Sequence, residues 1–451
     1  MRKCRIELLF AVLALVFGVV FLVITPPFQI ADEPAHYYRA YQVSQFEFVS
    51  QRIGNEVGGY VPKSILITAE AVSQNIARHP ENKQDVDKII SLLGQPLDGA
   101  NKEFVAFAGA VQYSPVVYVP QAIGIIIGQA FNGSPLVLLY LGRFMNLICW
   151  ILICFMAIRM LPVDKKVWVL LLLMPMSIFQ AASLSADAVT NALAVLATAL
   201  ALKYAYGKDK SLDQKALITL FAVFILLSLC KQVYIPMVLL FLLIPQSKIG
   251  TRLKYISVFI SLFVFCVAAS AIWMLVIKDL SAPIREGTSM MGQINYILSN
   301  PLGFLWIMAK SIAINAPRYV ASCIGAIGWG GKIFPIPFYF AYFIAVMLFA
   351  AISDDGVIVG WQDKMKILVA IVSVVFLIEL ALYLTWMPVG AQIIEGVQGR
   401  YFIPITFMAT LLLQNSKFKI KLFKYNYPLI VLCTLSLGLS VYMVLSRYYF
   451  V

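Results

Sequence analysis

The stretch TPPFQIADEPAHYYRAYQ, residues 25–42, decides the fold because it directly follows the first apolar run and so lies where a membrane helix meets water. Pro27 and Pro34 bracket its two adjacent carboxylates and restrict the backbone on either side of them. Surface charges are commonly only solvated, so the rest of the chain has to decide whether this stretch has a function. Its polar and aromatic side chains are those of Asp32, Glu33, His36, Arg39, Tyr37, Tyr38 and Tyr41.

The composition is that of a membrane protein. Of 451 residues, 61% are hydrophobic and 13% are charged, whereas soluble domains carry roughly 25% charged residues. Many windows of about 20 apolar residues are long enough to cross a bilayer as helices. The net charge of +13 comes from short basic clusters between apolar runs, a pattern typical of topology signals, and no nucleic-acid partner is expected. The seven cysteines include no Cys-x-x-Cys pair and indicate neither a metal site nor a disulfide framework.

The first part of the chain predicts one span and a long polar loop. Residues 8–24 follow a basic segment and are not followed by a small-residue cleavage site, which favours an uncleaved helix with a cytoplasmic N-terminus over a signal peptide. Residues 25–135 then form the first extracytoplasmic loop, in which amphipathic stretches at 63–77 and 85–93 predict helices on the membrane surface. For the apolar residues 114–131, which proline and glycine interrupt, we expect a surface-lying or re-entrant helix, with a full span as the alternative.

Basic clusters at the ends of the later apolar runs continue this alternation of cytoplasmic and extracytoplasmic loops. Residues 278–335 must begin and end outside, so they form a second large extracytoplasmic or re-entrant segment with either zero or two spans. We expect an all-α, polytopic helical membrane protein, with residues 1–451 as a single transmembrane domain. The number of transmembrane helices should be about eleven, or about thirteen if the second segment spans twice.

This topology gathers acids, bases and aromatic residues at the outer ends of the spans. Several have a simpler explanation: Asp187 suits the start of the next helix, Lys231 can reach the head groups, and Trp329 suits an interfacial aromatic belt. Lys231 can equally neutralise a lipid phosphate. Arg143 lies within an apolar helix, where a cation is costly unless it has a partner. The outer residues are Asp32, Glu33, His36, Arg39, Asp187, Lys231, Tyr234, Trp329, Arg400 and Tyr401.

The late segment GVQGRYFIP, residues 396–404, is harder to explain by topology alone. Two glycines flank Val397 and Gln398 just before Arg400, and glycine lets a backbone approach its neighbour closely. The chain has no Walker loop and no Gly-x-Gly-x-x-Gly after a strand, so ATP-driven work is not expected. His-Glu-x-x-His and Gly-x-Ser-x-Gly are also absent, which argues against a zinc protease and a serine hydrolase.

Five motifs carry a resemblance to a known family: PPFQIADEPAHYYRAYQ, SLSAD at 183–187, KQVYIP at 231–236, GAIGW at 325–329 and QGRYFIP at 398–404. With its PPFQ-x-x-DEPAH-x-YRA motif, the chain resembles a family of bacterial multi-pass membrane proteins of formerly unknown function. That family is grouped with the GT-C glycosyltransferases, which use polyprenyl-phosphate-linked sugars. The resemblance implies a GT-C-like helical fold. It also implies a general-base acid in the first loop, matched by Asp32 or Glu33, and a second acid matched by Asp187. The first motif has no Asp-x-Asp, so a divalent cation is an open question.

The expected reaction is inverting transfer of a sugar from a polyprenyl-phosphate donor to a glycan or lipid-linked acceptor of the cell envelope. Lys231, Arg400 and Arg143 would hold the phosphate, whose developing charge fixed cations stabilise. A carboxylate would take the proton of the acceptor hydroxyl, with Asp32 as the first choice and Glu33 orienting it or binding acceptor. The remaining candidates for holding sugar or phosphate are His36, Arg39, Tyr37, Tyr234, Trp329, Gln398 and Tyr401.

We therefore expect a glycosyltransferase in the bacterial plasma membrane with an extracytoplasmic active site. One alternative is a transporter or flippase of lipid-linked glycans, which would place ionisable residues near mid-membrane in two related halves. The other is a polymerase that joins lipid-linked repeat units at the same outer face.

Overall fold

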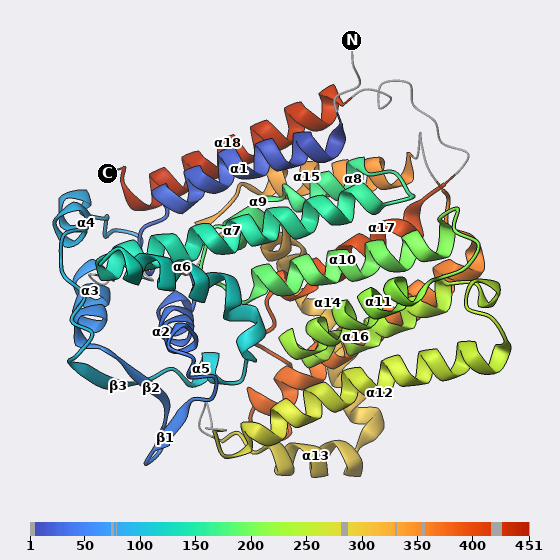
Figure 1. Ribbon diagram of the computed structural model, residues 1–451, viewed down its shortest axis with the longest axis horizontal. Coiled ribbons are helices and arrows are strands. Elements are labelled where there is room, and N and C mark those ends of the chain that lie inside the picture. The colour runs from blue at the N-terminus through green and yellow to red at the C-terminus, as the bar shows by residue number, and fades with distance from the viewer. Residues whose placement is uncertain are drawn as a thin grey trace.

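The computed structural model describes residues 5–73, 76–77, 79–280, 287–329, 332–352, 357–415 and 426–450, and these are mostly helical. Figure 1 shows the long helices lying side by side, with α1 next to α18. Within these described ranges, six helices are long and apolar enough to cross a membrane: α1 (Ile6–Ile24), α7 (Pro135–Met160), α10 (Asp187–Tyr206), α12 (Arg252–Val276), α16 (Trp361–Thr385) and α18 (Tyr427–Tyr448). A polytopic helical membrane protein is consistent with this arrangement.

Shorter helices fill the space between the long ones. Pro175 lacks an N–H group and begins a new helix, so the run after α7 is divided into α8 and α9. The shorter elements are η1 (Pro115–Tyr118), α6 (Val119–Ala130), α8 (Lys166–Leu172), α9 (Pro175–Ala181), α11 (Gln214–Cys230), η2 (Gln232–Leu243), η3 (Gln246–Lys248), η4 (Lys278–Leu280), α15 (Ile336–Ala351), η5 (Gly399–Phe402) and α17 (Ile403–Leu413). Length and composition support six candidate spans, or seven with one bent pair, among the described residues. The count of about eleven therefore stays a prediction.

The bent pair lies within residues 278–335, where we expected zero or two spans. Helices α13 (Met290–Ser299) and α14 (Pro301–Ile324) meet at 108°, the geometry of a broken span or a re-entrant loop. A short hairpin of β4 (Ala326–Ile327) and β5 (Lys332–Ile333) follows. Residues 281–286 and 330–331 of this segment lie outside the described residues.

Helix α6 forms an antiparallel hairpin with the first part of α7. Gly124 permits the close contact, because a Cβ at this position would lie 2.3 Å from the carbonyl oxygen of Leu141. Farther along, Gly128 faces Leu138, so the two helices stay in contact as far as the turn that connects them. With 12 residues, α6 is shorter than the helices that qualify as candidate spans, and a surface-lying or re-entrant position stays a prediction.

The first loop holds both the predicted helices and a small sheet that we did not predict. Helices α3 and α4 fall within the two amphipathic stretches. Strands β1, β2 and β3 form an antiparallel sheet in that order. Gly58 allows it, since a Cβ there would lie 1.8 Å from the carbonyl oxygen of Val105. The loop elements are α2 (Glu33–Ser44), β1 (Gln51–Ile53), β2 (Glu56–Pro62), α3 (Lys63–Ser73), α4 (Val86–Leu92), β3 (Lys102–Ala106) and α5 (Ala108–Val111).

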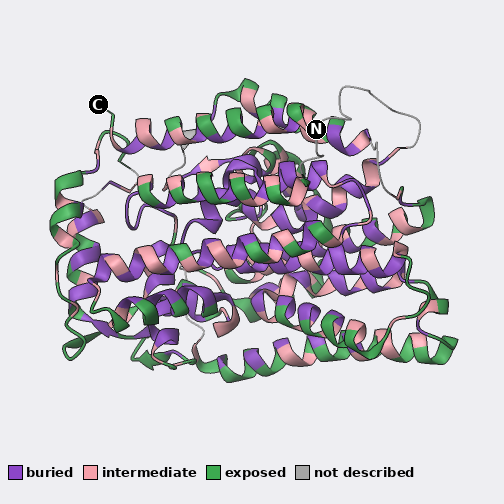
Figure 2. Cartoon of the chain, turned by 45° about the horizontal axis from the view of Figure 1, so that its top comes forward, coloured by how far each residue is buried: buried purple, intermediate pink, exposed green. Residues whose placement is uncertain are grey.

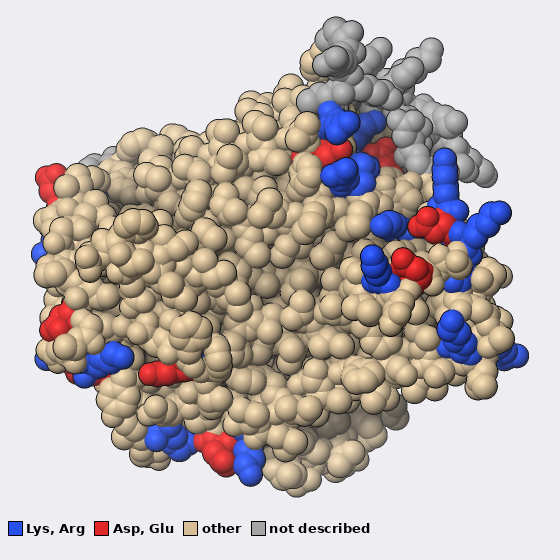
Figure 3. All heavy atoms as spheres, in the orientation of Figure 1, with Lys and Arg blue, Asp and Glu red and all other residues tan. Residues whose placement is uncertain are grey.

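The two ends of the helix bundle differ in character. The elements of the first loop cover one end, at the left of Figure 1, which we call the loop end. Lysines and arginines gather at the other end, at the right of Figure 3, which we call the basic end. A broad band almost free of charge separates the two on the face shown in Figure 3. Within the bundle α10 is almost wholly buried, whereas α12 lies at the periphery and is largely exposed, as Figure 2 shows.

Candidate functional site

Four charged side chains from distant parts of the chain meet at the loop end. Arg400 of η5 donates from Nη2 to Oδ2 of Asp32, which directly precedes α2, over 3.2 Å. The Nε atom of Arg400 lies 3.4 Å from Oδ2 of Asp187, the first residue of α10. Lys231, directly after α11, donates from Nζ to the other oxygen of Asp187 over 3.2 Å. Asp32, Arg400, Asp187 and Lys231 thus form a continuous series of ion pairs, the ion cluster.

Asp32 is the exposed member of the ion cluster, and the other three are largely buried. The Asp32 side chain is 51% exposed and that of Arg400 is 6% exposed. Asp187 and Lys231 are 10% and 18% exposed. Charges removed from water are costly unless they are paired, and two carboxylates here balance two cations. A solvent-borne ligand would meet Asp32 first and the cations behind it.

Asp32 is held in an unusual backbone conformation. It precedes α2 and so occupies the N-cap position, but its side chain makes no capping hydrogen bond. Its φ of 65° and ψ of 5° lie in the left-handed region, which aspartate tolerates better than most residues. Strained residues of this kind often lie at functional sites. The carboxylate is thereby directed to Arg400 instead of the helix end.

Tyrosine rings line the buried part of the ion cluster. The Nζ atom of Lys231 lies 4.1 Å from the ring centroid of Tyr401 and 5.7 Å from that of Tyr113. Both distances permit cation–π attraction. Tyr234 donates its hydroxyl to the carbonyl oxygen of Tyr401 over 2.8 Å and so holds η5 in place. Lys231, Tyr234, Arg400 and Tyr401, all predicted from the sequence, are brought together.

His36 lies one turn into α2, behind Asp32. Its Nδ1 and the hydroxyl of Tyr118 are 2.8 Å apart, and its ring is 5.9 Å from that of Tyr113. Burial lowers the pKa of His36 to about 4, although the charge of Asp32 acts in the opposite direction. The imidazole is therefore neutral at physiological pH and acts as a hydrogen-bonding partner, not as a cation for phosphate.

Glu33 and Arg143 form a separate, sealed ion pair. Arg143 Nε donates to Glu33 Oε1 over 2.8 Å, Arg143 Nη2 donates to Oε2, and both side chains are 0% exposed. Arg143 also donates to the carbonyl oxygens of Leu22, Thr25 and Pro26, at and just after the end of α1. The intramembrane arginine thus has the partner that it requires. Since neither group is accessible, we assign the pair to the fold and leave it out of the substrate site.

The side chains of Arg39 and Tyr37 also form hydrogen bonds within the first loop. Arg39 donates to Gln42 Oε1 over 2.6 Å and to the carbonyl oxygens of Glu47 and Phe48. Burial lowers the pKa of Arg39 to about 10. The Tyr37 hydroxyl donates to the carbonyl oxygen of Pro135 over 2.7 Å. Both side chains are fully buried, so they shape the loop.

Two further residues predicted from the sequence, Trp329 and Gln398, form hydrogen bonds with backbone atoms of Phe28 and Tyr401. The indole N–H of Trp329 donates to the carbonyl oxygen of Phe28 over 3.3 Å. Gln398 is exposed, and its carbonyl oxygen accepts from the N–H of Tyr401. The neighbouring Gly399 does permit a close approach, but to another helix: a Cβ there would lie 2.1 Å from the carbonyl oxygen of Tyr319 in α14.

Sequence reasoning missed two residues of the site. Gln180 donates from Nε2 to Oδ2 of Asp187 over 3.2 Å and accepts from Asn191. The only indication of Gln180 in the sequence was a single amide side chain within an apolar run. Tyr113 contributes a ring to both Lys231 and His36, and nothing in its local pattern distinguishes it from other tyrosines of the first loop.

The residues of the ion cluster do not fit a divalent cation. Metal sites of this kind use several carboxylate oxygens free to coordinate. Here Asp32 and Asp187 already bind Arg400, and Lys231 binds Asp187 as well. Among the described residues, no group of three or more His, Cys, Asp and Glu side chains could hold a metal ion.

An apolar groove begins at Gln232, the residue after Lys231 in the sequence. It has a volume of about 310 Å³ and is walled by η2, α12 and α16. The 12-residue η2 is unusually long for a 3₁₀ helix. Its residues at intervals of three lie above one another, so Gln232, Ile235 and Val238 form one row along the groove. The lining residues are Gln232, Ile235, Pro236, Val238, Leu239, Phe259, Phe263, Ser373 and Leu377.

Comparison with known proteins yields one match. The model of a family described as "Predicted membrane protein (DUF2142)" matches residues 15–409. No curated protein matches the chain. No solved structure matches it either.

Proposed function

Since this chain belongs to the DUF2142 family of predicted membrane proteins, we propose that it is a membrane glycosyltransferase. It transfers a sugar from a polyprenyl-phosphate donor to a cell-envelope glycan at the outer face of a bacterial plasma membrane. One observation carries the proposal. An exposed, conformationally strained carboxylate, Asp32, is linked through Arg400 and Asp187 to the partly buried cation Lys231. A base open to solvent and cations behind it are the two parts that such a reaction requires.

In the proposed reaction, the base and the cations have separate roles. The acceptor hydroxyl gives its proton to Asp32 as its oxygen forms a bond to the anomeric carbon. The bond from that carbon to the phosphate oxygen breaks, and the polyprenyl phosphate leaves with the electron pair. Arg400 and Lys231 stabilise the negative charge that develops on the leaving phosphate. Attack opposite the leaving group inverts the configuration of the sugar.

Asp187 would keep the two cations together before donor binds. Its oxygens contact Arg400 and Lys231 separately, so the cations point to a common position despite their mutual repulsion. The ring of Tyr401 under Lys231 limits where that ammonium can move. Prior positioning of this kind reduces the reorganisation that the transition state would otherwise require.

The groove beside Lys231 supports a donor with a lipid chain. It begins at Gln232, the residue after Lys231, and its walls are mostly apolar. A phosphate held by Lys231 would leave the attached chain at the mouth of this groove. Burial of apolar chain surface contributes about 25 cal/mol per Å², so the groove would add affinity without touching the reacting atoms.

Asp32→Asn tests the proposal. The amide keeps the size of the side chain and tolerates the left-handed conformation, but it cannot accept the proton. Sugar incorporation into the envelope glycan should fall by roughly 10²–10⁴-fold, measured with labelled lipid-linked donor in membrane vesicles. Asp87→Asn, at an exposed position in the first turn of α4, is the matched control and should leave incorporation unchanged.

Three results would point elsewhere. Unchanged sugar incorporation in Asp32→Asn would reject Asp32 as the base. Donor trapped on the inner leaflet would favour a flippase. Loss of long glycan chains alone, with single sugars still added, would favour a polymerase.

A further inference from the structure

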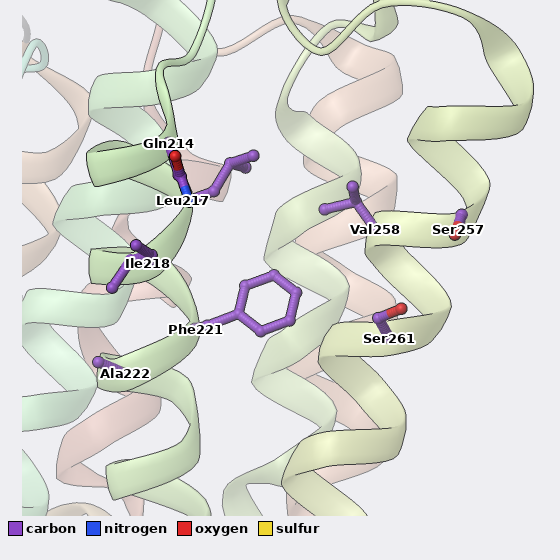
Figure 4. Close-up of a pocket in the computed structure, with 8 residues that line it drawn as sticks. All are labelled: Gln214, Leu217, Ile218, Phe221, Ala222, Ser257, Val258 and Ser261. Atoms are coloured by element: carbon purple, nitrogen blue, oxygen red, sulfur yellow. The ribbon is translucent and has the colours of Figure 1, made fainter.

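A second groove lies at the opposite end of the molecule from the ion cluster. It has a volume of about 470 Å³ and runs between the first turns of α11 and α12. Figure 4 shows Leu217 and Phe221 extending from one helix toward Val258 of the other across this gap. The lining residues are Gln214, Leu217, Ile218, Phe221, Ala222, Ser257, Val258 and Ser261. The groove is therefore apolar along its length, with few polar groups.

The polar groups of α12 lie along one face of the helix. Lys254, Ser257 and Ser261 are spaced by three and four residues, so the lysine lies one turn beyond the serines toward the basic end. The hydroxyl of Thr219 on α11 donates to the carbonyl oxygen four residues earlier. No such bond is present at Ser257 or Ser261, although both lie in the described part of α12. Their hydroxyl groups are thus available to a ligand in the groove.

Three exposed cations lie on the first turns of the two helices that form the groove. Lys215 follows Gln214 on α11, and Arg252 and Lys254 lie in the first turn of α12. None of the three forms an ion pair within the described residues. The nearest acid in the sequence, Asp213, accepts a hydrogen bond from the N–H of Ala216 and caps α11. The three cations therefore outnumber the one carboxylate next to them in the sequence, which leaves a net positive charge there.

We propose that this groove binds an anionic glycerophospholipid. The head-group phosphate lies between Lys215 and Lys254, with Arg252 nearby, and one acyl chain follows Leu217, Phe221 and Val258 between the helices. Basic residues next to an apolar gap between membrane helices match both parts of such a lipid. The site is separate from the ion cluster, so this inference does not depend on the proposed function.

The test measures lipids retained by the purified full-length protein in mixed detergent micelles, with phosphatidylglycerol or phosphatidylcholine of the same acyl chains added. Native mass spectrometry should show at least about tenfold preferential retention of phosphatidylglycerol at low salt, falling steeply as salt screens the cations. The double variant Lys215→Ala/Lys254→Ala should lose most of this preference. The matched control Lys63→Ala/Lys102→Ala, at exposed positions of the loop end, should keep it.

A third variant tests the groove itself. Ser261→Trp would fill the gap and should reduce retention of both lipids. Equal retention of the two lipids by the wild-type protein would overturn the proposal, as would an unaltered preference in the double variant. Should the double variant fail to fold, the salt series on the wild-type protein decides: a preference that persists at 1 M salt, where the Debye length is about 3 Å, would overturn an electrostatic site.

Discussion

Asp32 and Glu33 are neighbours in the sequence, yet the two carboxylates serve different regions of the molecule. Glu33 is 0% exposed and bound by Arg143 in a pair that also joins the end of α1. Asp32 is half exposed and bound at one side only, by Arg400. Adjacent side chains at the start of a helix point in different directions. The comparison teaches that one acid holds the first loop to the bundle, whereas its neighbour faces solvent beside Arg400.

The largest effect should come from breaking the sealed pair. Arg143→Ala leaves the Glu33 carboxylate without its partner in a buried position, and removing one partner of such a pair typically costs about 3–5 kcal/mol. We expect the variant to unfold at a much lower temperature than the wild type, measured by the thermal stability of the detergent-solubilised protein. Arg400→Ala leaves Asp32 facing solvent and Asp187 still paired with Lys231, so it should be less destabilised.

A double variant separates charge from packing in this prediction. Arg143→Met/Glu33→Leu removes both charges and should recover part of the lost stability. If Arg143→Ala and Arg400→Ala lost equal stability, the contrast between a sealed and an open ion pair would be wrong.

His36 offers a second test, through pH. Its pKa is lowered from 6.5 to about 4 in the folded protein, so between these values the unfolded state binds more protons. Stability should therefore fall as pH decreases from about 6.5 toward 4, by about 3 kcal/mol in total at roughly 1.4 kcal/mol per unit. In His36→Gln this contribution should be absent. Parallel pH profiles of thermal stability for the two proteins would contradict the buried, neutral imidazole.

A smaller effect, on activity alone, is expected at the other end of the ion cluster. Lys231→Gln keeps a hydrogen-bond donor near Asp187 but removes the charge over Tyr401. Hydrogen bonds to charged groups contribute about 1.5–3 kcal/mol, so kcat/KM for the lipid-linked donor should fall by roughly 10–100-fold. Lys102→Gln, an exposed lysine of β3, provides the control. An unchanged kcat/KM would remove Lys231 from the proposed phosphate site.

The sequence predicted which charged residues lie together better than it predicted the contacts of each one. Apolar runs and basic clusters identified the membrane class, and the outer ends of the runs supplied all four members of the ion cluster. The roles of Glu33, Arg39 and Tyr37 depend on contacts with residues far away in the chain, such as Arg143 and Pro135. Periodicity contains no information on such contacts. The sheet of the first loop was missed for a similar reason, because Gly58 becomes a strand residue only when Val105 packs against it.

The backbone of Asp32 provides the most delicate test, in comparison with the ordinary helix cap Asp85. Asp85 has a φ of −79° and accepts a hydrogen bond from the N–H of Lys88, whereas Asp32 has a φ of 65° and caps nothing. A left-handed conformation costs most residues roughly 1–2 kcal/mol, and glycine pays almost none of it. Asp32→Gly should therefore be more stable than Asp32→Ala by about 1 kcal/mol, although both lose the carboxylate and should be equally inactive. At Asp85 no left-handed backbone contributes, and only the ordinary cap is lost, which costs a few tenths of a kcal/mol on replacement by glycine and about 1 kcal/mol on replacement by alanine. Thermal unfolding of the four proteins measures both differences, and an Asp32→Ala protein as stable as Asp32→Gly would show that the backbone of Asp32 relaxes freely and is not held in place for the reaction.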